Sequence, residues 1–450
     1  MSSSNFIKRL RSVMPERIRF AEADELEPYS RDRTARQNLS PAFVLFPETT
    51  EEVATIVRTA FEFRQPLTVS GGRTGYAGGA IAAPDEAILS FERMNRLLGY
   101  DPYLPALHVQ AGMTTRAVQM EAASRGHFFP VDFASASASH IGGNLATHAG
   151  GIRVLKYGTI RRYAIGLTAV DGRGEILRFP DLLKNNTGYD LKELLIGSEG
   201  TLALITEATL QLVPEPPATD LVLMAFRDFS SLLEALSILR PLDLHAFEIF
   251  DDACLRLICD HRSLPCPFSD VPAFTALVEY VPGTTDEVLM TVPAEDIRLA
   301  SDEAQRRRFW IYREGISEAL SLSGPVHKND ISVPIAKAAE AVDALRQIQS
   351  DTLPGTLFIF GHLADGNLHI NVVAPSNMDE AVFRAQATDF DLRSYTFLSS
   401  VGGSISAEHG IGRLKKNYLS YSRSEREIEL MRSIKNAFDP RHILNRGRIF

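Results

Sequence analysis

The sequence predicts an α+β protein with two domains, and three observations support this prediction. The chain has 450 residues, which is long for a single hydrophobic core. Helix and strand signals alternate in the first half without a regular strand–helix–strand repeat. Three prolines stand within four residues in the segment VPEPPATD (213–220), and such a cluster stops a strand and marks a boundary. We therefore expect domains over residues 1–214 and 215–399, followed by a C-terminal segment over 400–450.

Capping and turn residues predict the individual elements. The segment 47–63 (PETTEEVATIVRTAFEF) has a threonine cap, acidic first-turn residues and apolar residues at helical spacing, so we expect a helix. The segments 66–72 (PLTVSGG) and 106–112 (ALHVQAG) are typical of strands that end at glycine turns. The second region mixes strands such as 356–363 (TLFIFGHL) with helices such as 336–349. We expect the last helix to stop at Asp439-Pro440.

Composition excludes several classes of protein. The 47 basic and 56 acidic residues give a net charge of −9, which argues against a nucleic-acid binder or a binder of acidic membranes. Three cysteines without a CxxC pattern fit a reducing compartment better than a disulfide framework. No apolar run approaches the ~20 residues that span a bilayer, and the N-terminus lacks the apolar core of a secretory signal. We expect a cytoplasmic protein, with an organelle leader as the alternative.

The segment 356–371 (TLFIFGHLADGNLHIN) reads as a β-hairpin that carries two histidines. Asp365-Gly366 is a strong turn signal between two strand patterns. If Leu363 pairs with Leu368, His362 lies directly opposite His369, with Cβ atoms roughly 5 Å apart. That spacing suits two imidazoles on one metal ion, although single histidines are most often ordinary core or surface residues.

A second segment offers further candidate ligands. The sequence ISAEHGIG (405–412) presents Glu408 and His409 beside a glycine turn. Together with the hairpin, it would complete a site of two histidines and one glutamate with one histidine to spare. This site is a hypothesis that needs support from the first half of the chain.

Three glycine-rich segments in the first half supply that support. The loop 70–80 (SGGRTGYAGGA) follows a strand and has five glycines in eleven residues, so its backbone N–H groups can line an anion-binding turn. It matches neither the Rossmann fingerprint nor the P-loop. The segments 140–151 (HIGGNLATHAGG) and 195–206 (LIGSEGTLALIT) add two more such loops. Three glycine loops in one domain favour an extended ligand that carries phosphate.

The ordered set of motifs resembles a known family. In addition to the segments above, it comprises DFASASAS before the 140–151 loop, NNTGYDLKE before the 195–206 loop, KNDISVP and FDPRHILN. Together they resemble the FAD-linked D-2-hydroxyacid dehydrogenases of the vanillyl-alcohol oxidase / p-cresol methylhydroxylase superfamily over roughly residues 42–450. Within it the D-2-hydroxyglutarate dehydrogenases are most similar, with D-lactate dehydrogenases and the glycolate oxidase flavin subunit as near relatives.

The resemblance implies a two-domain flavoprotein. Its p-cresol methylhydroxylase-type domain would bind FAD, its α+β cap domain would carry metal and substrate, and residues 400–450 would complete the active site and pack on the FAD domain. Arg73 stands where some superfamily members have a histidine bonded to the flavin, so non-covalent FAD is implied. The implied FAD contacts are Gly71, Gly72, Arg73, Thr74, Gly75, Gly142, Gly143, Asn144, Thr147, Gly151, Glu199, Gly200, Ile205 and Asn445.

The resemblance also implies the reaction. A divalent metal on His362, His369 and Glu408 would polarise the substrate 2-hydroxyl, with zinc expected first and manganese, cobalt or iron as alternatives. His409 would take the hydroxyl proton while the C2 hydride passes to flavin N5. The implied substrate-binding residues are Arg313, Ser317, Lys328 and Asn371.

Three positions depart from the family pattern: Asn329 replaces a common tyrosine, His148 a usual asparagine and Arg446 a frequent proline. Because Asn329 is next to Lys328, this departure bears on substrate size and on the site for the second carboxylate. Arg313 and Lys328 together favour D-2-hydroxyglutarate as the substrate, with D-lactate or another D-2-hydroxy monocarboxylate as the alternative.

Other classes stay open from the sequence. One is a non-haem iron oxygenase that uses the same two histidines and glutamate, another a flavin-fold assembly subunit without turnover, and a third an oxidase that passes electrons to oxygen. For a dehydrogenase, the resemblance implies an electron-transfer flavoprotein or a quinone as acceptor, and a homodimer is one expected assembly.

Overall fold

The computed structural model describes residues 2–14, 19–20, 26–34, 40–283 and 285–450. It divides the chain into two compact units. The first comprises residues 1–151, 158–215 and 408–450, and the second comprises residues 152–157 and 216–407. Residues 400–407 belong to the second unit because Ser332 and Ser404 exchange two backbone hydrogen bonds, at 3.1 and 2.8 Å. No helix among the described residues is long and apolar enough to cross a membrane.

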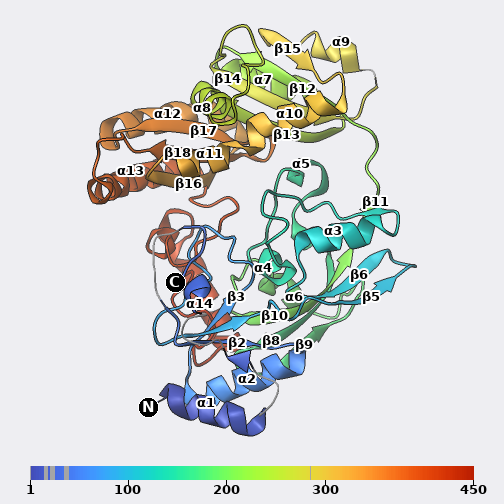
Figure 1. The fold of residues 1–450 in the computed structure, drawn as a ribbon, viewed down its shortest axis with the longest axis vertical. Helices are drawn as coiled ribbons and strands as arrows, with labels where there is room; N and C mark the ends of the chain where they lie inside the picture. Colours follow the sequence, from blue (N-terminus) through green and yellow to red (C-terminus); the bar gives the residue numbers. More distant parts are fainter. Residues whose placement is uncertain (1, 15–18, 21–25, 35–39, 284) are drawn as a thin grey trace. The chain divides into compact units, whose positions relative to one another are not determined.

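The first unit is built on two main sheets (Figure 1). One sheet has the strand order β1 (Arg19–Phe20), β2 (Phe43–Phe46), β4 (Ala87–Ser90), β3 (Leu67–Ser70), in which β4 runs parallel to both β2 and β3. The other is antiparallel, in the order β5 (Leu97–Asp101), β6 (Ala106–Gln110), β10 (Ala203–Gln211), β8 (Ala164–Asp171), β9 (Ile176–Phe179). A short pair, β7 (His127–Phe128) and β11 (Val213–Pro214), completes the strands among the described residues.

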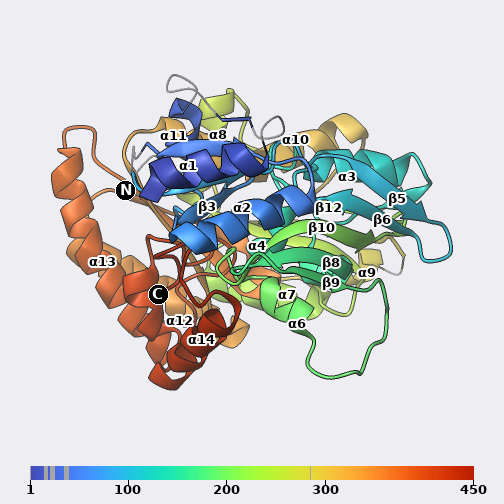
Figure 2. The same ribbon diagram turned by 90° about the horizontal axis from the view of Figure 1, so that it is seen from below.

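Helix α2 of this unit begins where its capping residue predicts. The Thr49 side chain accepts the N–H of Glu52, so α2 starts at Thr50 and runs to Phe63. Helix α1 (Ser2–Val13) lies beside α2 (Figure 2), and its buried Phe6 stacks on Phe43 with ring centroids 5.8 Å apart. The remaining helices are α3 (Thr115–Ala123), α4 (Ile141–Ala146), α6 (Leu191–Leu195) and α14 (Glu425–Phe438), the last of which has a capping box at Ser424.

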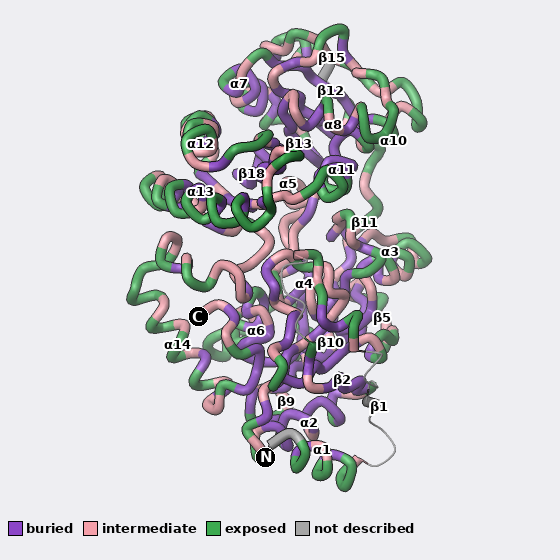
Figure 3. The backbone as a smooth tube through the Cα atoms, turned by 60° about the vertical axis from the view of Figure 1, so that its left-hand side comes forward, coloured by how far each residue is buried: buried purple, intermediate pink, exposed green. Residues whose placement is uncertain are grey.

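The second unit is one antiparallel sheet covered by helices. Its strand order is β15 (Asp296–Leu299), β12 (Asp220–Phe226), β14 (Phe274–Tyr280), β13 (Leu244–Asp251), β17 (Thr356–His362), β18 (Asn367–Val373), β16 (Val326–Ser332). One face packs on α8 (Asp252–Arg262), α10 (Glu303–Glu314) and α11 (Ile316–Leu322). The other helices are α5 (Val154–Tyr157), α7 (Phe229–Leu239), α9 (Thr285–Leu289), α12 (Ala338–Thr352) and α13 (Glu380–Ser400). Buried residues concentrate in the strands, whereas α12, α13 and α14 turn much of their surface to solvent (Figure 3).

Candidate active site

The glycine loop after β3 forms a turn, called the cradle below, that presents unpaired backbone N–H groups in the first unit. Within the described part of the chain, the backbone N–H groups of residues 71–75 donate no hydrogen bond to protein. A β-carbon on Gly72 would lie 1.9 Å from the carbonyl oxygen of Ala138, so only glycine fits there. Arg73 takes the left-handed conformation with φ 55°. Consecutive unpaired N–H groups in such a turn bind phosphate oxygens, so this loop fits the pyrophosphate of a dinucleotide.

The side chain of Arg73 is held at the edge of this cradle. Its guanidinium forms an ion pair with Glu92 at 2.8 Å and lies over the Tyr29 ring at 4.5 Å. Burial and the negative charge of Glu92 raise the pKa of Tyr29 to about 12, so its hydroxyl stays protonated at neutral pH. These contacts hold Arg73 in place, and its part in the cradle comes from its backbone.

The loop that enters α4 packs against the cradle. A β-carbon on Gly71 would lie 3.4 Å from Cβ of His140, and one on Gly142 would lie 2.6 Å from Cβ of Ala111. Asn144 donates to the Thr115 hydroxyl at 2.7 Å, and the Thr147 hydroxyl donates to the carbonyl of Gly143 at 3.0 Å. Of the predicted loop residues, Gly142, Gly143 and Asn144 belong to the helix that begins beside the cradle.

Two other predicted FAD contacts, Gly151 and Ile205, pack against residues outside the cradle. Gly151 lies against Asp132, where a β-carbon would be 2.0 Å from the Asp132 carbonyl oxygen. Ile205 is buried within β10 and pairs with Ala169. Neither of these contacts involves the loop 71–75.

Glu199 fixes the turn that follows His409. Its two carboxylate oxygens accept the N–H groups of Ile411 and Gly412, each at 2.7 Å. Burial raises the pKa of Glu199, and the two backbone donors oppose that effect. Asn445 donates to the carbonyl of Glu199 and accepts the N–H of Val69 at 2.9 Å. Glu199 and Asn445 therefore join β3, which leads into the cradle, to the turn after His409.

His409 lies next to the same loop. Its ring centroid is 4.8 Å from that of Tyr76, the residue after the cradle, and its Nε2 is 3.8 Å from the carboxylate of Glu408. Burial raises the pKa of Tyr76. Nothing in the sequence singled out Tyr76 except its place inside the glycine loop.

The second unit brings both hairpin histidines to one face of its sheet, but the predicted register is wrong. His362 pairs with Asn367, and His369 pairs with Phe360. A 3-10 turn takes up residues 363–365 and Gly366 has φ 81°, so the loop begins one residue earlier than predicted. The shift by two positions keeps the side chains on one face, and the two imidazole centroids lie 5.7 Å apart.

Each of these histidines meets a buried carboxylate that the sequence analysis missed. Glu248, which pairs with His362 across β13 and β17, accepts from His362 Nδ1 at 2.6 Å. Asp330 has an oxygen 3.7 Å from His369 Nδ1 and accepts the N–H of Ala407 at 3.1 Å. Such contacts favour the tautomer with hydrogen on Nδ1, which leaves the lone pair on Nε2 for a metal. The one signal for Glu248 was a single carboxylate inside an apolar strand.

The predicted substrate-binding residues border the same sheet face. Arg313, buried at the end of α10, has its guanidinium 2.8 Å from Glu248 and over the Phe360 ring at 5.0 Å. Burial alone would raise the pKa of Glu248, but the contacts with His362 and Arg313, including the hydrogen bonds that they donate, lower it. The carboxylate is therefore ionised, and it partly neutralises Arg313.

Lys328 and Asn371 are direct neighbours across β16 and β18. The Lys328 ammonium donates to the Ser321 hydroxyl at 3.2 Å, one helical turn beyond the exposed Ser317 on α11. The structure thus brings Lys328, Asn371 and the surface of α11 together.

Asn329, although next to Lys328 in the sequence, faces away from these residues. Its amide donates to Asp391 at 2.7 Å and accepts from Tyr395 at 2.8 Å, both on α13. Side chains alternate along β16, so Lys328 and Asn329 lie on opposite faces. The other two unusual residues are also engaged: His148 bonds Thr159 at 2.6 Å, and Arg446 pairs with Asp85 at 2.6 Å.

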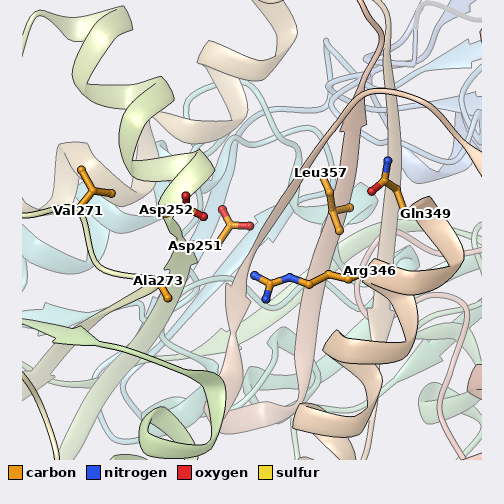
Figure 4. A pocket seen from close by; sticks show the side chains of 7 residues that line it. All are labelled: Asp251, Asp252, Val271, Ala273, Arg346, Gln349 and Leu357. Carbon is orange, nitrogen blue, oxygen red and sulfur yellow. The ribbon is translucent and has the colours of Figure 1, made fainter. Parts of the chain in front are cut away.

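A separate hollow of about 540 Å³ lies on the second unit (Figure 4). It is lined by Asp251, Asp252, Val271, Ala273, Arg346, Gln349 and Leu357. None of the predicted site residues is among them.

Comparison with known proteins identifies the family. The profile of FAD linked oxidases, C-terminal domain, matches residues 215–449, and that of an FAD binding domain matches residues 41–180. The chain is 37% identical over 464 residues to D-2-hydroxyglutarate dehydrogenase of Stutzerimonas stutzeri, with full coverage of both chains. It is 36% identical to the mitochondrial D-2-hydroxyglutarate dehydrogenase of Bos taurus, covering 98% of this chain and 83% of that one.

Solved structures share the fold. p-Cresol methylhydroxylase matches with a TM-score of 0.80 at 15% identity, covering 99% of this chain and 96% of that one. Alkyldihydroxyacetonephosphate synthase matches with a TM-score of 0.76 at 18% identity, covering 99% and 86%. The predicted α+β flavoprotein fold is confirmed, and a non-haem oxygenase leaves the FAD binding domain unexplained. The chain therefore belongs to the FAD-linked oxidase family and is an FAD-dependent oxidoreductase.

Proposed function

We propose that the protein oxidises D-2-hydroxyglutarate to 2-oxoglutarate. The observation that carries this proposal is one sheet face in the second unit with His362, His369, Arg313 and Lys328 along it. Two imidazoles suit a metal that binds a 2-hydroxyl, and two cations suit two carboxylates. The names of the similar curated dehydrogenases support the same substrate.

The first unit would bind FAD without a covalent bond. In this site FAD would supply the acceptor for the hydride that leaves C2 of the substrate. The unpaired N–H groups of residues 71–75 would hold its pyrophosphate. Other FAD contacts would come from Gly142, Gly143, Asn144, Thr147, Gly151, Glu199, Gly200, Ile205 and Asn445. Arg73 has no nucleophilic ring nitrogen, which supports non-covalent binding.

His362, His369 and Glu408 would hold a divalent metal, which supplies a Lewis acid for the 2-hydroxyl. Two imidazoles and a carboxylate accept zinc, manganese, cobalt or iron, and zinc is our first choice. Glu248 and Asp330 would orient the imidazoles through their Nδ1 atoms.

The other residues would bind the substrate and move its proton. His409 would accept the 2-hydroxyl proton, with its ring placed by the contact with Tyr76. Arg313 and Lys328 would bind the two carboxylates, and Ser317 and Asn371 would add neutral hydrogen bonds. An electron-transfer flavoprotein or a quinone would then reoxidise the enzyme, which we propose to be a homodimer in the cytoplasm.

D-Lactate, which has one carboxylate, is the second candidate. Glu248 partly neutralises Arg313, so Lys328 alone keeps a full positive charge to favour a substrate with a second carboxylate. Measured kcat/KM values for D-2-hydroxyglutarate and D-lactate decide between the two. One charge-assisted hydrogen bond corresponds to about 10- to 150-fold, so we expect a preference for the dicarboxylate in that range. The Lys328→Met substitution should remove most of it. Equal kcat/KM values for both acids would reject the dicarboxylate assignment.

A further inference from the structure

His140 carries a buried nitrogen that the described protein leaves without a hydrogen bond. The residue is 9% exposed, and its Nδ1 has no partner among the described residues. A β-carbon on Gly71 would lie 3.4 Å from His140 Cβ and 3.8 Å from Nδ1. This nitrogen therefore lies beside Gly71, the first residue of the cradle formed by residues 71–75.

The backbone around His140 is fixed, so its imidazole is held at this place. The His140 carbonyl accepts the N–H of Asn144 at 2.9 Å, and the Ser139 carbonyl accepts the N–H of Thr115 at 3.1 Å. The hydroxyls of Thr115 and Ser139 lie 2.8 Å apart. Native proteins pair nearly all buried polar groups. The unpaired Nδ1 of His140 therefore suggests that a bound ligand supplies its hydrogen-bond partner.

We propose that Nδ1–H of His140 donates a hydrogen bond to a phosphate oxygen of the FAD pyrophosphate held by residues 71–75. This proposal rests on the proposed role of the cradle and is independent of the hydroxyacid and the metal. Burial lowers the pKa of His140, so its ring is neutral near pH 7. A neutral ring with hydrogen on Nδ1 adds one directed donor to the backbone donors.

Two substitutions separate the hydrogen bond from the volume of the ring. His140→Asn places an amide nitrogen at the same number of bonds from the backbone as Nδ1, whereas His140→Leu fills similar space without a donor. FAD affinity is measured on FAD-free protein by quenching of flavin fluorescence. We expect His140→Leu to weaken binding about tenfold or more, and His140→Asn to stay within about threefold of the unsubstituted protein.

The ³¹P NMR spectrum and the visible spectrum show which part of FAD the His140 side chain contacts. The ³¹P resonances of bound FAD should move in His140→Leu, while the visible flavin spectrum stays unchanged. Unchanged affinity in His140→Leu, or an altered visible spectrum with unmoved ³¹P resonances, would overturn the proposal. Gly72→Ala tests the cradle separately: if it weakens FAD binding and His140→Leu does not, only the role of His140 fails.

A measurement on the unsubstituted protein covers the case in which His140→Leu does not fold. In protein with ¹⁵N-labelled histidine, the Nδ1 resonance that is missing from His140→Asn should shift when FAD is added. A resonance that does not move would reject the proposal.

Discussion

Glu248 accepts a hydrogen bond from Nδ1 of His362 at 2.6 Å, and the same carboxylate forms an ion pair with Arg313 at 2.8 Å. One buried anion thus links a proposed metal ligand to a proposed substrate-binding residue. Its position directly across the sheet from His362 fixes this arrangement by strand register.

Replacing Glu248 with glutamine should weaken metal binding. The loss of its charge removes the strongest partner of the His362 Nδ1–H group, and changes of this kind cost about 10- to 100-fold in metal affinity. Metal affinity is measured by titration of metal-free protein with Zn²⁺ or Co²⁺. Asp391→Asn is the matched control. Asp391 makes a similar contact, 2.7 Å from its carboxylate to Nε2 of His327, on the face of β16 that lies opposite to Lys328. Equal losses in both variants would argue against a metal at His362.

Glutamine at position 199 should lower the turnover number. Only one atom of the new amide accepts hydrogen bonds, so one of the N–H groups of Ile411 and Gly412 loses its partner, at a cost of about 1–3 kcal/mol. We expect the turn after His409 to loosen, which amide hydrogen exchange of residues 410–412 measures alongside kcat. Glu193→Gln, which alters a partly exposed ion pair with Arg161, is the control. An unchanged exchange rate at this turn would contradict the role of Glu199.

Alanine at position 72 should abolish tight FAD binding or folding of the loop, because its β-carbon would lie 1.9 Å from the Ala138 carbonyl oxygen. Gly79 lies in the same segment, and a β-carbon there meets no atom within 4 Å. Gly79→Ala should therefore bind FAD as the unsubstituted protein does. The flavin-to-protein ratio after purification checks both variants, and similar ratios would show that the loop is not a cradle.

The raised pKa of the Asp251 carboxyl predicts that the free energy of unfolding depends on pH. Burial raises its pKa from 3.8 to about 6, although its carboxylate accepts the N–H groups of Cys254 and Ile359. A folded-state pKa above the unfolded value contributes stability at low pH that is lost as the pH rises through 6, on the order of 3 kcal/mol.

The Asp251→Asn variant isolates this effect. Between pH 4 and pH 7, the unsubstituted protein should lose on the order of 3 kcal/mol of unfolding free energy relative to Asp251→Asn. Denaturant titrations at several pH values measure it. A difference that stays constant with pH would show that Asp251 is not perturbed.

The sequence predicted the elements whose signals are local. Thr49 caps its helix as expected because a cap depends on a few adjacent residues. The hairpin was found but its register was not, because the 3-10 turn at Leu363–Asp365 depends on packing that no local pattern encodes. A one-residue error in the loop moved the partner of His362 by two positions.

Long-range partners were out of reach. Glu248 lies 114 positions from His362, and Glu199 lies 212 positions from Ile411. Neither pairing has a spacing that a sequence pattern reveals, since each arises from strand pairing or loop packing. His140 was passed over because its significance lies in an unused nitrogen, which only the three-dimensional surroundings disclose.

The most direct test of the proposed function is an anaerobic titration of the purified flavoprotein, followed through its visible flavin spectrum. D-2-Hydroxyglutarate, D-lactate and their L-enantiomers are added in turn, with and without a chelator. We expect D-2-hydroxyglutarate to bleach the flavin at the lowest concentration, the chelator to prevent bleaching and added Zn²⁺ to restore it. A flavin that no D-2-hydroxyacid bleaches, or that bleaches equally well without metal, would contradict the proposed reaction.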